Sequence, residues 1–402
     1  MRLIITSLVY SFAARPLFAF AFLKHVTITS NHYTNQPIAS KTNGPDNTSL
    51  LNPLNLNNGT IPRPKSLSPT SAIEFLNCPQ AFLFRYLYKL KHGASAAALK
   101  GTLCHKALER LYDLKPRERT INNLHNLFRQ EWATKRKENP DILHELFHSS
   151  TDKEKSWGKE ALRLLDNYYD IENPQLIKPA LRERWIHAQL PIKPISSTRK
   201  IAPRKQHSDE SFKITGIIDR LDVTPVHQKS TTEQTVATII DYKTGPAPTW
   251  NEIHSEDKTA LEARFLQLKI YALLLSENSR HRNYTRPIPV RYLRLIYLTN
   301  DKQRAQILEY DLGRGNEQRN KQLREVHETL SETWLMINSL VSKQDPTLFV
   351  GCNRPYCNCH TDRQKFVPGT VWEPHQRMKT NQDHRSQTRA TVANRTLDRL
   401  RI

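Results

Sequence analysis

The hydrophobic and polar positions of the chain follow a helical period through the first half of its folded region, which should begin near Ser66. Residues 67–76 predict a helix, because Ser68 can act as the N-cap, Pro69 fits the first turn, and the apolar side chains share one face. Further helices are predicted at residues 98–112, 124–137 and 155–169. This part of the chain is therefore expected to be helical.

The period then changes to alternating or continuous apolar residues, which indicates β-strands. Strands are predicted at residues 181–189, 212–223, 235–242, 290–298 and 307–312. A helix is predicted within this series at residues 261–276, and a long helix after it at residues 313–342. The polar residues 225–233 suit a hairpin-like return between the second and third strands. This order of elements predicts an α/β fold with an N-terminal helical region.

The two ends of the chain lack a core pattern. The first residues form an apolar run that could be a signal peptide or a membrane anchor, but Arg15 and Pro16 interrupt it. A charge at the centre of a span costs about 2.5 kcal/mol or more, and proline breaks a helix. A mis-assigned start or a poorly ordered extension competes with that interpretation, and a cytoplasmic protein without a membrane partner is expected. The predicted regions are an extension at 1–30, a disordered linker at 31–65, a folded domain at 66–350, a cysteine-containing segment at 351–366 and a basic disordered tail at 367–402.

The charge of the chain is strongly positive, with 60 Lys and Arg against 39 Asp and Glu and a formal net charge of +21. This balance favours a polyanionic partner, because basic side chains that neutralise phosphates release condensed counterions. Nucleic acid is the expected partner, and a solvated or membrane-associated basic surface is the alternative. Five cysteines in 402 residues, an odd number, argue against a disulfide scaffold and favour a reducing compartment. The sequence contains no P-loop, so ATP hydrolysis by this chain alone is not expected.

Two of the predicted strands carry acids. Asp219 lies on the strand at 212–223, and Asp241 and Lys243 lie at the end of the next strand. Because strand side chains alternate between faces, Asp241 and Lys243 project from the same face. Two carboxylates and an amine at one point are the minimum for holding a divalent metal and activating a water against a phosphodiester. The alternative is a structural ion pair, between Asp219 and Lys243 or between Arg220 and Asp241.

Three further features accompany these acids. His105 lies at the start of a helical run and could complete a metal site or contact a phosphate, although a lone histidine is often structural. Glu183, on the strand before Asp219, could add a carboxylate or be an exposed charge between arginines. Gln267 and Tyr271 stand one helical turn apart and can hydrogen-bond phosphate oxygens or bases, although this spacing is ordinary in amphipathic helices.

These features follow one another along the chain as Gly-Thr-Leu-x-His, Gly-x-x-Asp-Arg-Leu-Asp, Asp-Tyr-Lys-Thr-Gly and Gln-x-x-x-Tyr. This order resembles the PD-(D/E)xK nuclease superfamily and, within it, the RecB-family exonuclease-like domains. The resemblance also includes the segment from Ser68 to Pro79 and the aromatic and basic run at residues 82–88, and it covers residues 66–350. It implies a restriction-endonuclease-like core, with a mixed central sheet flanked by helices.

The resemblance also implies a role for each matching residue. The implied catalytic residues are Asp219, Asp241 and Lys243, and the implied ligands of Mg²⁺ or Mn²⁺ are His105, Asp219 and Asp241. Lys243 would orient or activate the attacking water and stabilise developing negative charge. Gln267 and Tyr271 would position the DNA strand, and the implied product carries a 5′-phosphate.

The cysteines resemble a further feature of this family. Some RecB-type nucleases hold a 4Fe-4S cluster through one cysteine in the opening helix and three near the C-terminus. Cys78 matches the first, and Cys352, Cys357 and Cys359 match the other three in number. Their spacing departs from the family pattern, because a four-residue gap is followed by a single residue. The alternatives are a Zn²⁺ site that uses His360, and unligated thiols.

The expected function is metal-dependent hydrolysis of DNA, as an exonuclease acting on single-stranded or duplex ends in recombinational repair. Because the chain lacks a motor motif, a separate helicase is an expected partner. One alternative is a non-catalytic DNA-binding subunit of a repair complex, which would leave labelled DNA uncut. Another is a CRISPR-adaptation nuclease of related fold, which neighbouring genes would distinguish.

Overall fold

The computed structural model describes residues 60–90, 95–193, 210–226, 234–255, 259–281, 288–354 and 357–364. All of these residues belong to one compact unit. The predicted extension at 1–30, residues 31–59 of the predicted linker and the predicted tail at 367–402 lie outside the described residues. Among the helices in the described ranges, none is both long enough and apolar enough to cross a membrane.

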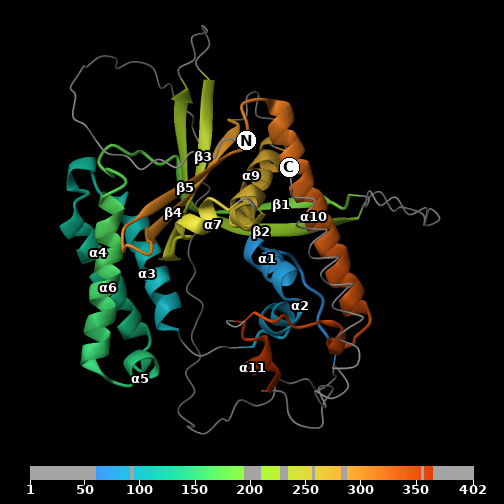
Figure 1. The fold of residues 1–402 in the computed structure, drawn as a ribbon, viewed down its shortest axis with the longest axis horizontal. Coiled ribbons are helices and arrows are strands. Elements are labelled where there is room, and N and C mark those ends of the chain that lie inside the picture. The colour runs from blue at the N-terminus through green and yellow to red at the C-terminus, as the bar shows by residue number, and fades with distance from the viewer. Residues whose placement is uncertain are drawn as a thin grey trace, which may run out of the picture. The chain divides into compact units, whose positions relative to one another are not determined.

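A five-stranded mixed sheet forms the centre of the fold (Figure 1). In spatial order its strands are β1 (Leu181–Pro191), β2 (Ser211–Val226), β3 (Gln234–Pro246), β4 (Val290–Thr299) and β5 (Gln306–Asp311). Neighbouring strands are antiparallel, except that β3 and β4 are parallel. A parallel pair needs a crossover connection, which the helices between these two strands provide. The predicted strands are confirmed, and β2 and β3 are antiparallel neighbours, as the predicted hairpin requires. Residues 227–233 of the predicted return lie outside the described residues.

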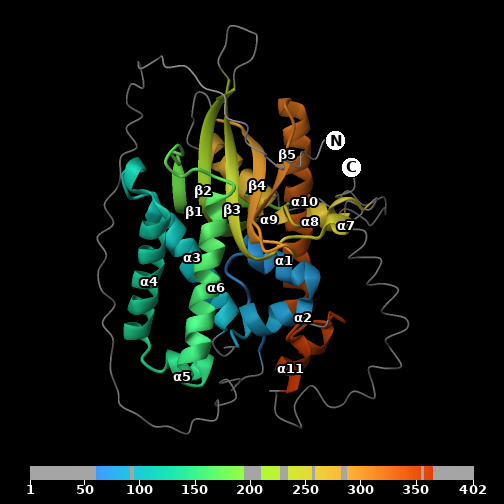
Figure 2. The same cartoon turned by 60° about the vertical axis from the view of Figure 1, so that its left-hand side comes forward.

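A group of four helices packs against one face of the sheet (Figure 2). The group consists of α3 (Ala96–Leu111), α4 (Ile121–Glu138), α5 (Ile142–Phe147) and α6 (Thr151–Tyr169). Side-chain hydroxyls of Ser95, Thr120 and Ser150 cap the first turns of α3, α4 and α6. The apolar faces of these helices share a core with Tyr242 of β3 and Ile296 of β4. Burial of this shared core fixes the orientation of β3.

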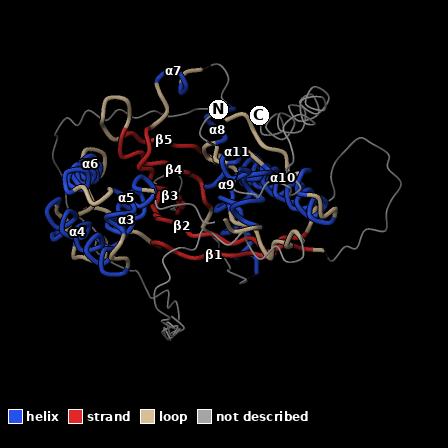
Figure 3. Tube along the Cα trace, turned by 90° about the horizontal axis from the view of Figure 1, so that it is seen from below, coloured by secondary structure: helices blue, strands red, loops and turns tan. Residues whose placement is uncertain are grey.

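The opposite face of the sheet is covered by α9 (Leu266–His281), with α1 (Pro69–Asn77) and α10 (Asn316–Ser342) packed beside it. Figure 3 shows the strands between this group and the group of α3 to α6. A Cβ atom on Gly216 of β2 would lie only 2.6 Å from the ring of Tyr271, so glycine permits the close approach of α9 to the strand. The predicted α/β fold, a mixed sheet flanked by helices with an N-terminal helical region, is confirmed.

The structure corrects one predicted helix. Residues 261–276 do not form a continuous helix, because α8 (Thr259–Ala263) ends before α9 begins. The N–H of Phe265 donates to the carbonyl of Glu262, three residues back, which marks a tighter turn than an α-helix makes. Phe265 is fully buried at this turn. The break therefore allows α9 to begin at the sheet with its own orientation.

Several short elements carry no clear period in the sequence, and the sequence did not predict them. They are α2 (Pro79–Phe82), a π-helical turn (Leu83–Leu87), α5, α7 (Trp250–Ile253), α11 (Cys359–Gln364), and 3-10 turns at Pro116–Glu118 and Pro346–Leu348. The N-terminus of α1, in contrast, follows the prediction. The Ser68 hydroxyl accepts from the N–H of Ser71 at 3.0 Å, and the Ser71 hydroxyl accepts from the N–H of Ser68 at 2.7 Å. This reciprocal cap fixes where α1 begins.

Candidate active site

The two predicted acids, Asp219 and Asp241, lie on the adjacent strands β2 and β3. The recorded pairing of these strands ends at Arg220 with Ile240, and the two acids are the next residues beyond this pair. An oxygen of Asp219, Oδ2, accepts a hydrogen bond of 3.0 Å from the backbone N–H of Tyr242. Asp241 is 2% exposed, and its carboxylate lies on the face that α9 covers. The hairpin therefore brings both carboxylates to one place.

Lys243, Gln267 and Tyr271 form a polar network around Asp241. The Lys243 ammonium lies 2.6 Å from Asp241 Oδ2 and donates to the Gln267 side-chain oxygen at 3.2 Å. The Gln267 amide nitrogen lies 3.1 Å from Asp241 Oδ1 and 3.2 Å from the Tyr271 hydroxyl. Residues from β3 and from two successive turns of α9 therefore hold one another in position. The structure brings together all four residues that the sequence singled out here.

His105 and Glu183 complete the site from the other side of Asp219. His105 Nδ1 lies 3.2 Å from Asp219 Oδ2. One nitrogen or oxygen atom each of His105, Glu183 and Asp219 all lie within 4.8 Å of one another. His105 projects from the middle of α3, rather than from the start of a helix as the sequence suggested. The helix–sheet packing that carries this histidine to the acids depends on contacts far apart in the sequence.

Glu183 has an unusual backbone conformation for a strand residue. Its φ of 39° lies in the left-handed region, which non-glycine residues rarely adopt. The β1–β2 pairing is recorded for Arg182 with Arg220 and for Arg184 with Ile218, on either side of Glu183. Such strain persists where surrounding structure imposes it, and it is concentrated at functional sites. The alternative that Glu183 is merely an exposed charge is wrong, because its side chain lies beside Asp219 and His105.

The acids at this site oppose one another's ionisation. Burial and the neighbouring charge of Asp219 raise the pKa of Asp241 to about 6 and that of Glu183 to about 7. Burial disfavours the charged form of His105, but the hydrogen bond to Asp219 and the negative charges of the neighbouring acids together outweigh it and raise the histidine pKa. For Lys243, burial is likewise outweighed by Asp241, so the ammonium pKa is raised. A divalent cation would relieve the repulsion among the carboxylates, so this set of oxygen donors and one imidazole fits Mg²⁺ or Mn²⁺.

The two structural ion pairs considered from the sequence are not formed. Among the described residues, Lys243 pairs with Asp241 rather than Asp219, and Arg220 does not pair with Asp241. Arg220 is 1% exposed and makes a bidentate pair with Glu172, with both N–O distances 2.8 Å. It also lies 3.1 Å from Asp222. Glu172 was not predicted from the sequence, where the only signal for it was that a buried arginine requires a carboxylate partner.

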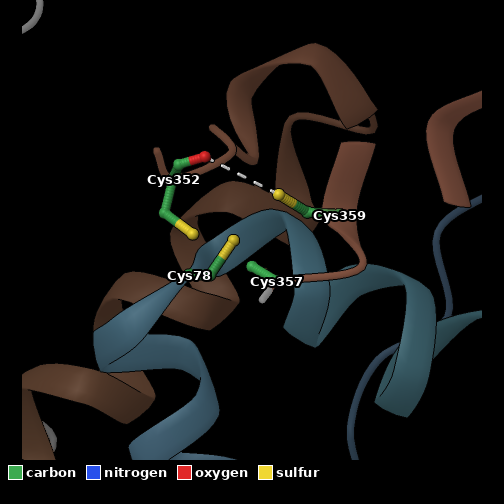
Figure 4. Close-up of side chains that lie close together, drawn as sticks. All are labelled: Cys78, Cys352, Cys357 and Cys359. Carbon is green, nitrogen blue, oxygen red and sulfur yellow. Dashed lines mark hydrogen bonds between the residues drawn. The ribbon is translucent and has the colours of Figure 1, made fainter. Parts of the chain in front are cut away.

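The four cysteines of the possible metal site converge at a second place (Figure 4). Cys78 lies between α1 and α2, and Cys352, Cys357 and Cys359 lie after α10. Their four sulfur atoms all lie within 4.8 Å of one another. A single tetrahedral Zn²⁺ with bonds of about 2.3 Å would place four sulfurs about 3.8 Å apart, and a larger cluster would hold them further apart. Four converging thiols fit a soft metal centre.

Among the described residues, the group of ligand atoms that meet here includes the four cysteines and does not include His360. Its Nε2 lies 2.7 Å from the carbonyl oxygen of Cys352. Burial raises the pKa of Cys78, so that this thiol is protonated when no metal is bound. Burial also opposes ionisation of Cys352, but hydrogen bonds from Arg354 outweigh it and lower the pKa of Cys352 to about 7. The zinc alternative that uses His360 is thus not supported by the position of its ring.

Comparison with known protein families agrees with this geometry. A model of the PD-(D/E)XK nuclease superfamily matches residues 66–361, which include the candidate active site and all four converging cysteines. The chain belongs to the PD-(D/E)XK nuclease superfamily. Its mixed sheet flanked by helices is the restriction-endonuclease-like core that the sequence predicted. Among curated proteins, no significant sequence match to this chain was found.

Proposed function

We propose that this protein is a Mg²⁺- or Mn²⁺-dependent deoxyribonuclease, and that it acts as an exonuclease on single-stranded or duplex DNA ends. The observation that carries the proposal is the convergence of His105, Asp219, Asp241 and Lys243 from α3, β2 and β3 at one place. A stability role alone does not account for clustering acids whose charges raise one another's pKa. Membership of the PD-(D/E)XK superfamily supports a nuclease.

His105, Asp219 and Asp241 would hold the metal, and Glu183 offers one more carboxylate. When bound, Mg²⁺ or Mn²⁺ would polarise the scissile phosphate and lower the pKa of an attacking water. The Lys243 ammonium is kept charged by Asp241, so it can stabilise negative charge that develops on the phosphate. No covalent enzyme intermediate is needed for such a hydrolysis.

Gln267 and Tyr271 are proposed to position the DNA strand. Gln267 already uses its amide to connect Lys243, Asp241 and Tyr271, so its side chain is held in one orientation. A pre-oriented amide and a phenol beside the metal ligands can hydrogen-bond the phosphate oxygens of a bound strand. Their proposed role is therefore to align the scissile phosphate with Lys243.

The resemblance to RecB-type exonuclease domains supports a role in recombinational repair, with a separate helicase that supplies DNA ends. The sequence has no P-loop of its own, which favours a partner motor. A non-catalytic DNA-binding subunit is the competing proposal. The connected network of Asp241, Lys243 and Gln267 favours the enzyme over that subunit.

The test is cleavage of end-labelled single- and double-stranded DNA by the full chain with Mn²⁺ or Mg²⁺, compared with EDTA. Lys243→Ala is expected to slow cleavage by about 10²-fold or more, because it removes a charge that stabilises the transition state. DNA binding by this variant, measured in EDTA, should change little. If the parent cuts neither substrate with either metal yet binds both, the non-catalytic subunit is the better account.

We also propose that the four cysteines hold a 4Fe-4S cluster, as in the RecB-type domains that the chain resembles. The support is the convergence of four sulfurs and their number, which suits a cluster with one thiolate on each iron. Zn²⁺ bound by the same four sulfurs is the second candidate, because separations within 4.8 Å are close to those around one tetrahedral ion. Either centre would fasten Cys78, near the start of the described fold, to the segment after α10.

The Cys78→Ser variant is expected to lose this metal and to unfold at a lower temperature than the parent, because a metal bound only by the folded state stabilises it. Iron, acid-labile sulfide and zinc should be measured per chain after anaerobic purification, together with the melting temperature. Cys104→Ala is the matched control, because Cys104 is a buried residue of α3 and lies outside the group of four cysteines. A parent protein without iron or zinc would contradict the proposal.

A further inference from the structure

One side of the β1–β2 hairpin carries an exposed aromatic and basic strip. Trp185 of β1 is 51% exposed, and its cross-strand partner Ile217 of β2 is 45% exposed. The ring of His187 lies against the indole with centroids 4.7 Å apart, and the Lys213 ammonium lies 5.8 Å from the indole centroid. These four residues, Trp185, His187, Lys213 and Ile217, are called the hairpin strip.

The hairpin strip leads into the candidate active site. Ile217 precedes Asp219 by two residues on β2, so the two lie about 7 Å apart along the strand. On β1, Trp185 follows Glu183 by two residues. Glu183 and Asp219 lie within 4.8 Å of His105 and of each other through their polar atoms. A nucleic acid strand bound at these acids can therefore continue onto the hairpin strip.

The chemistry of the hairpin strip fits nucleic acid better than a protein partner. Within the described residues, the Lys213 ammonium has no carboxylate in ion-pair contact, and its cross-strand neighbour is the uncharged Gln189. The cores of protein interfaces are depleted in lysine. An exposed indole beside a lysine is instead the combination by which proteins stack unpaired bases and hold the adjacent backbone. The net charge of +21 adds a long-range attraction of the same sign.

We infer that the hairpin strip binds an unpaired DNA strand next to the candidate active site, with a base stacked on Trp185 and a phosphate beside Lys213. His187 supports the indole on the side away from Glu183 and Asp219, as the order of residues along the hairpin shows. The inference rests on the proposed nuclease function. It specifies the substrate further, because bases within a duplex are already stacked and paired and cannot stack on Trp185.

The test measures binding of a fluorescent oligothymidylate to the full chain by anisotropy in EDTA, where no metal-dependent cleavage can occur. An oligomer of about 16 nucleotides covers the upper range of site sizes in single-strand binding folds. Trp185→Ala is expected to weaken binding by about 10-fold or more, and Trp185→Phe to restore most of it, because one base–aromatic stack is worth that much. Trp250→Ala, which removes another exposed indole, is the control and should bind like the parent.

Salt dependence separates the stacking residue from the phosphate-binding residue. Lys213→Gln should reduce the slope of log affinity against log salt by about 0.7, the value for one phosphate contact on a single strand. Trp185→Ala should weaken binding without changing this slope. If Trp185→Ala binds oligothymidylate like the parent, the hairpin strip serves a protein partner and the inference is wrong.

The inference and the nuclease proposal fail in different ways. Binding that depends on Trp185 in a protein without metal-dependent cleavage would support the hairpin strip and overturn the nuclease. Metal-dependent cleavage together with unchanged binding by Trp185→Ala would support the nuclease and overturn the hairpin strip. An equal loss of affinity in Trp185→Ala and Trp250→Ala would also overturn the inference, because no particular place on the surface would then be responsible.

Discussion

Replacement of Asp241 by asparagine is expected to lower the rate of metal-dependent DNA cleavage by about 10³-fold or more, as for loss of one member of a catalytic group that acts as a unit. Asp241 is buried between the Lys243 ammonium and the Gln267 amide, and it is a proposed ligand of the metal. Asparagine keeps the size of the side chain but removes its negative charge. The cation would lose a ligand, and Lys243 would lose the group that holds its charge in place.

The Asp241→Asn variant is expected to lose activity while it keeps its fold. Burial and Asp219 raise the pKa of Asp241 to about 6, so its folded-state proton affinity exceeds that of the unfolded chain. Ionisation of such a group at neutral pH opposes folding, and a neutral isostere removes that cost. The melting temperature of Asp241→Asn should therefore be no lower than that of the parent.

The measurement is the initial rate of cleavage of end-labelled DNA across a range of Mn²⁺ concentrations. Asp166→Asn is a suitable control, because Asp166 is an exposed acid on α6 whose partner is His125. It should cleave like the parent. If Asp241→Asn cleaves at the parent rate, Asp241 is not a metal ligand and the assignment of the active site is wrong. Unchanged DNA binding by Asp241→Asn, measured in EDTA, would show that the lost step is chemical.

The sequence could predict the hairpin of the active site because its information is local. Alternation along β3 places Asp241 and Lys243 on one face, and an antiparallel return from β2 brings Asp219 close to them. The helical spacing of Gln267 and Tyr271 likewise puts them on one side of α9. These relations hold whatever the rest of the chain does.

The sequence could not predict the contacts that join distant segments. His105 reaches Asp219 only because the apolar face of α3 packs against β3, and no local pattern gives that distance. The strained backbone of Glu183 also depends on its surroundings. The irregular spacing of the cysteines gave no clear prediction that they would bind one metal centre. They come together because the chain returns to α1 after α10, and this does not depend on their spacing.

Arg220 is the charged residue that the sequence placed in an apolar strand without a known partner, and its replacement is expected to give the largest loss of stability. It is 1% exposed and makes its bidentate pair with Glu172, whose side chain is also buried. Its Nη1 also lies 2.7 Å from the Tyr242 hydroxyl, on the face of β3 opposite Asp241. These contacts of Arg220, called the Arg220 network, join the segment just after α6 to the strands that carry both acids.

Arg220→Met should lower the free energy of unfolding by about 3–5 kcal/mol, because the buried Glu172 carboxylate loses its bidentate partner and keeps only the longer contact with Arg294, at 3.6 Å. Equilibrium unfolding in urea at neutral pH measures this change. Lys135→Ala breaks an exposed ion pair with Glu138 and should cost about 0–1 kcal/mol. Adding Glu172→Gln to Arg220→Met should recover part of the loss, since it removes a buried charge that has lost its main partner.

The pH dependence of the same variant gives an independent check of the Arg220 network. In the parent, burial opposes the Glu172 charge, but Arg220, together with Tyr168 and Arg294, outweighs burial and lowers the carboxyl pKa below its ordinary value. The pair therefore stabilises the parent above that ordinary value, and the parent loses this stability as pH falls through the lowered pKa. In Arg220→Met, Glu172 keeps Arg294 at 3.6 Å but loses Arg220, so burial is opposed less and the pKa of Glu172 is higher than in the parent. The stability difference between parent and variant should shrink as pH falls, and a constant difference would show that Glu172 is not the residue responsible.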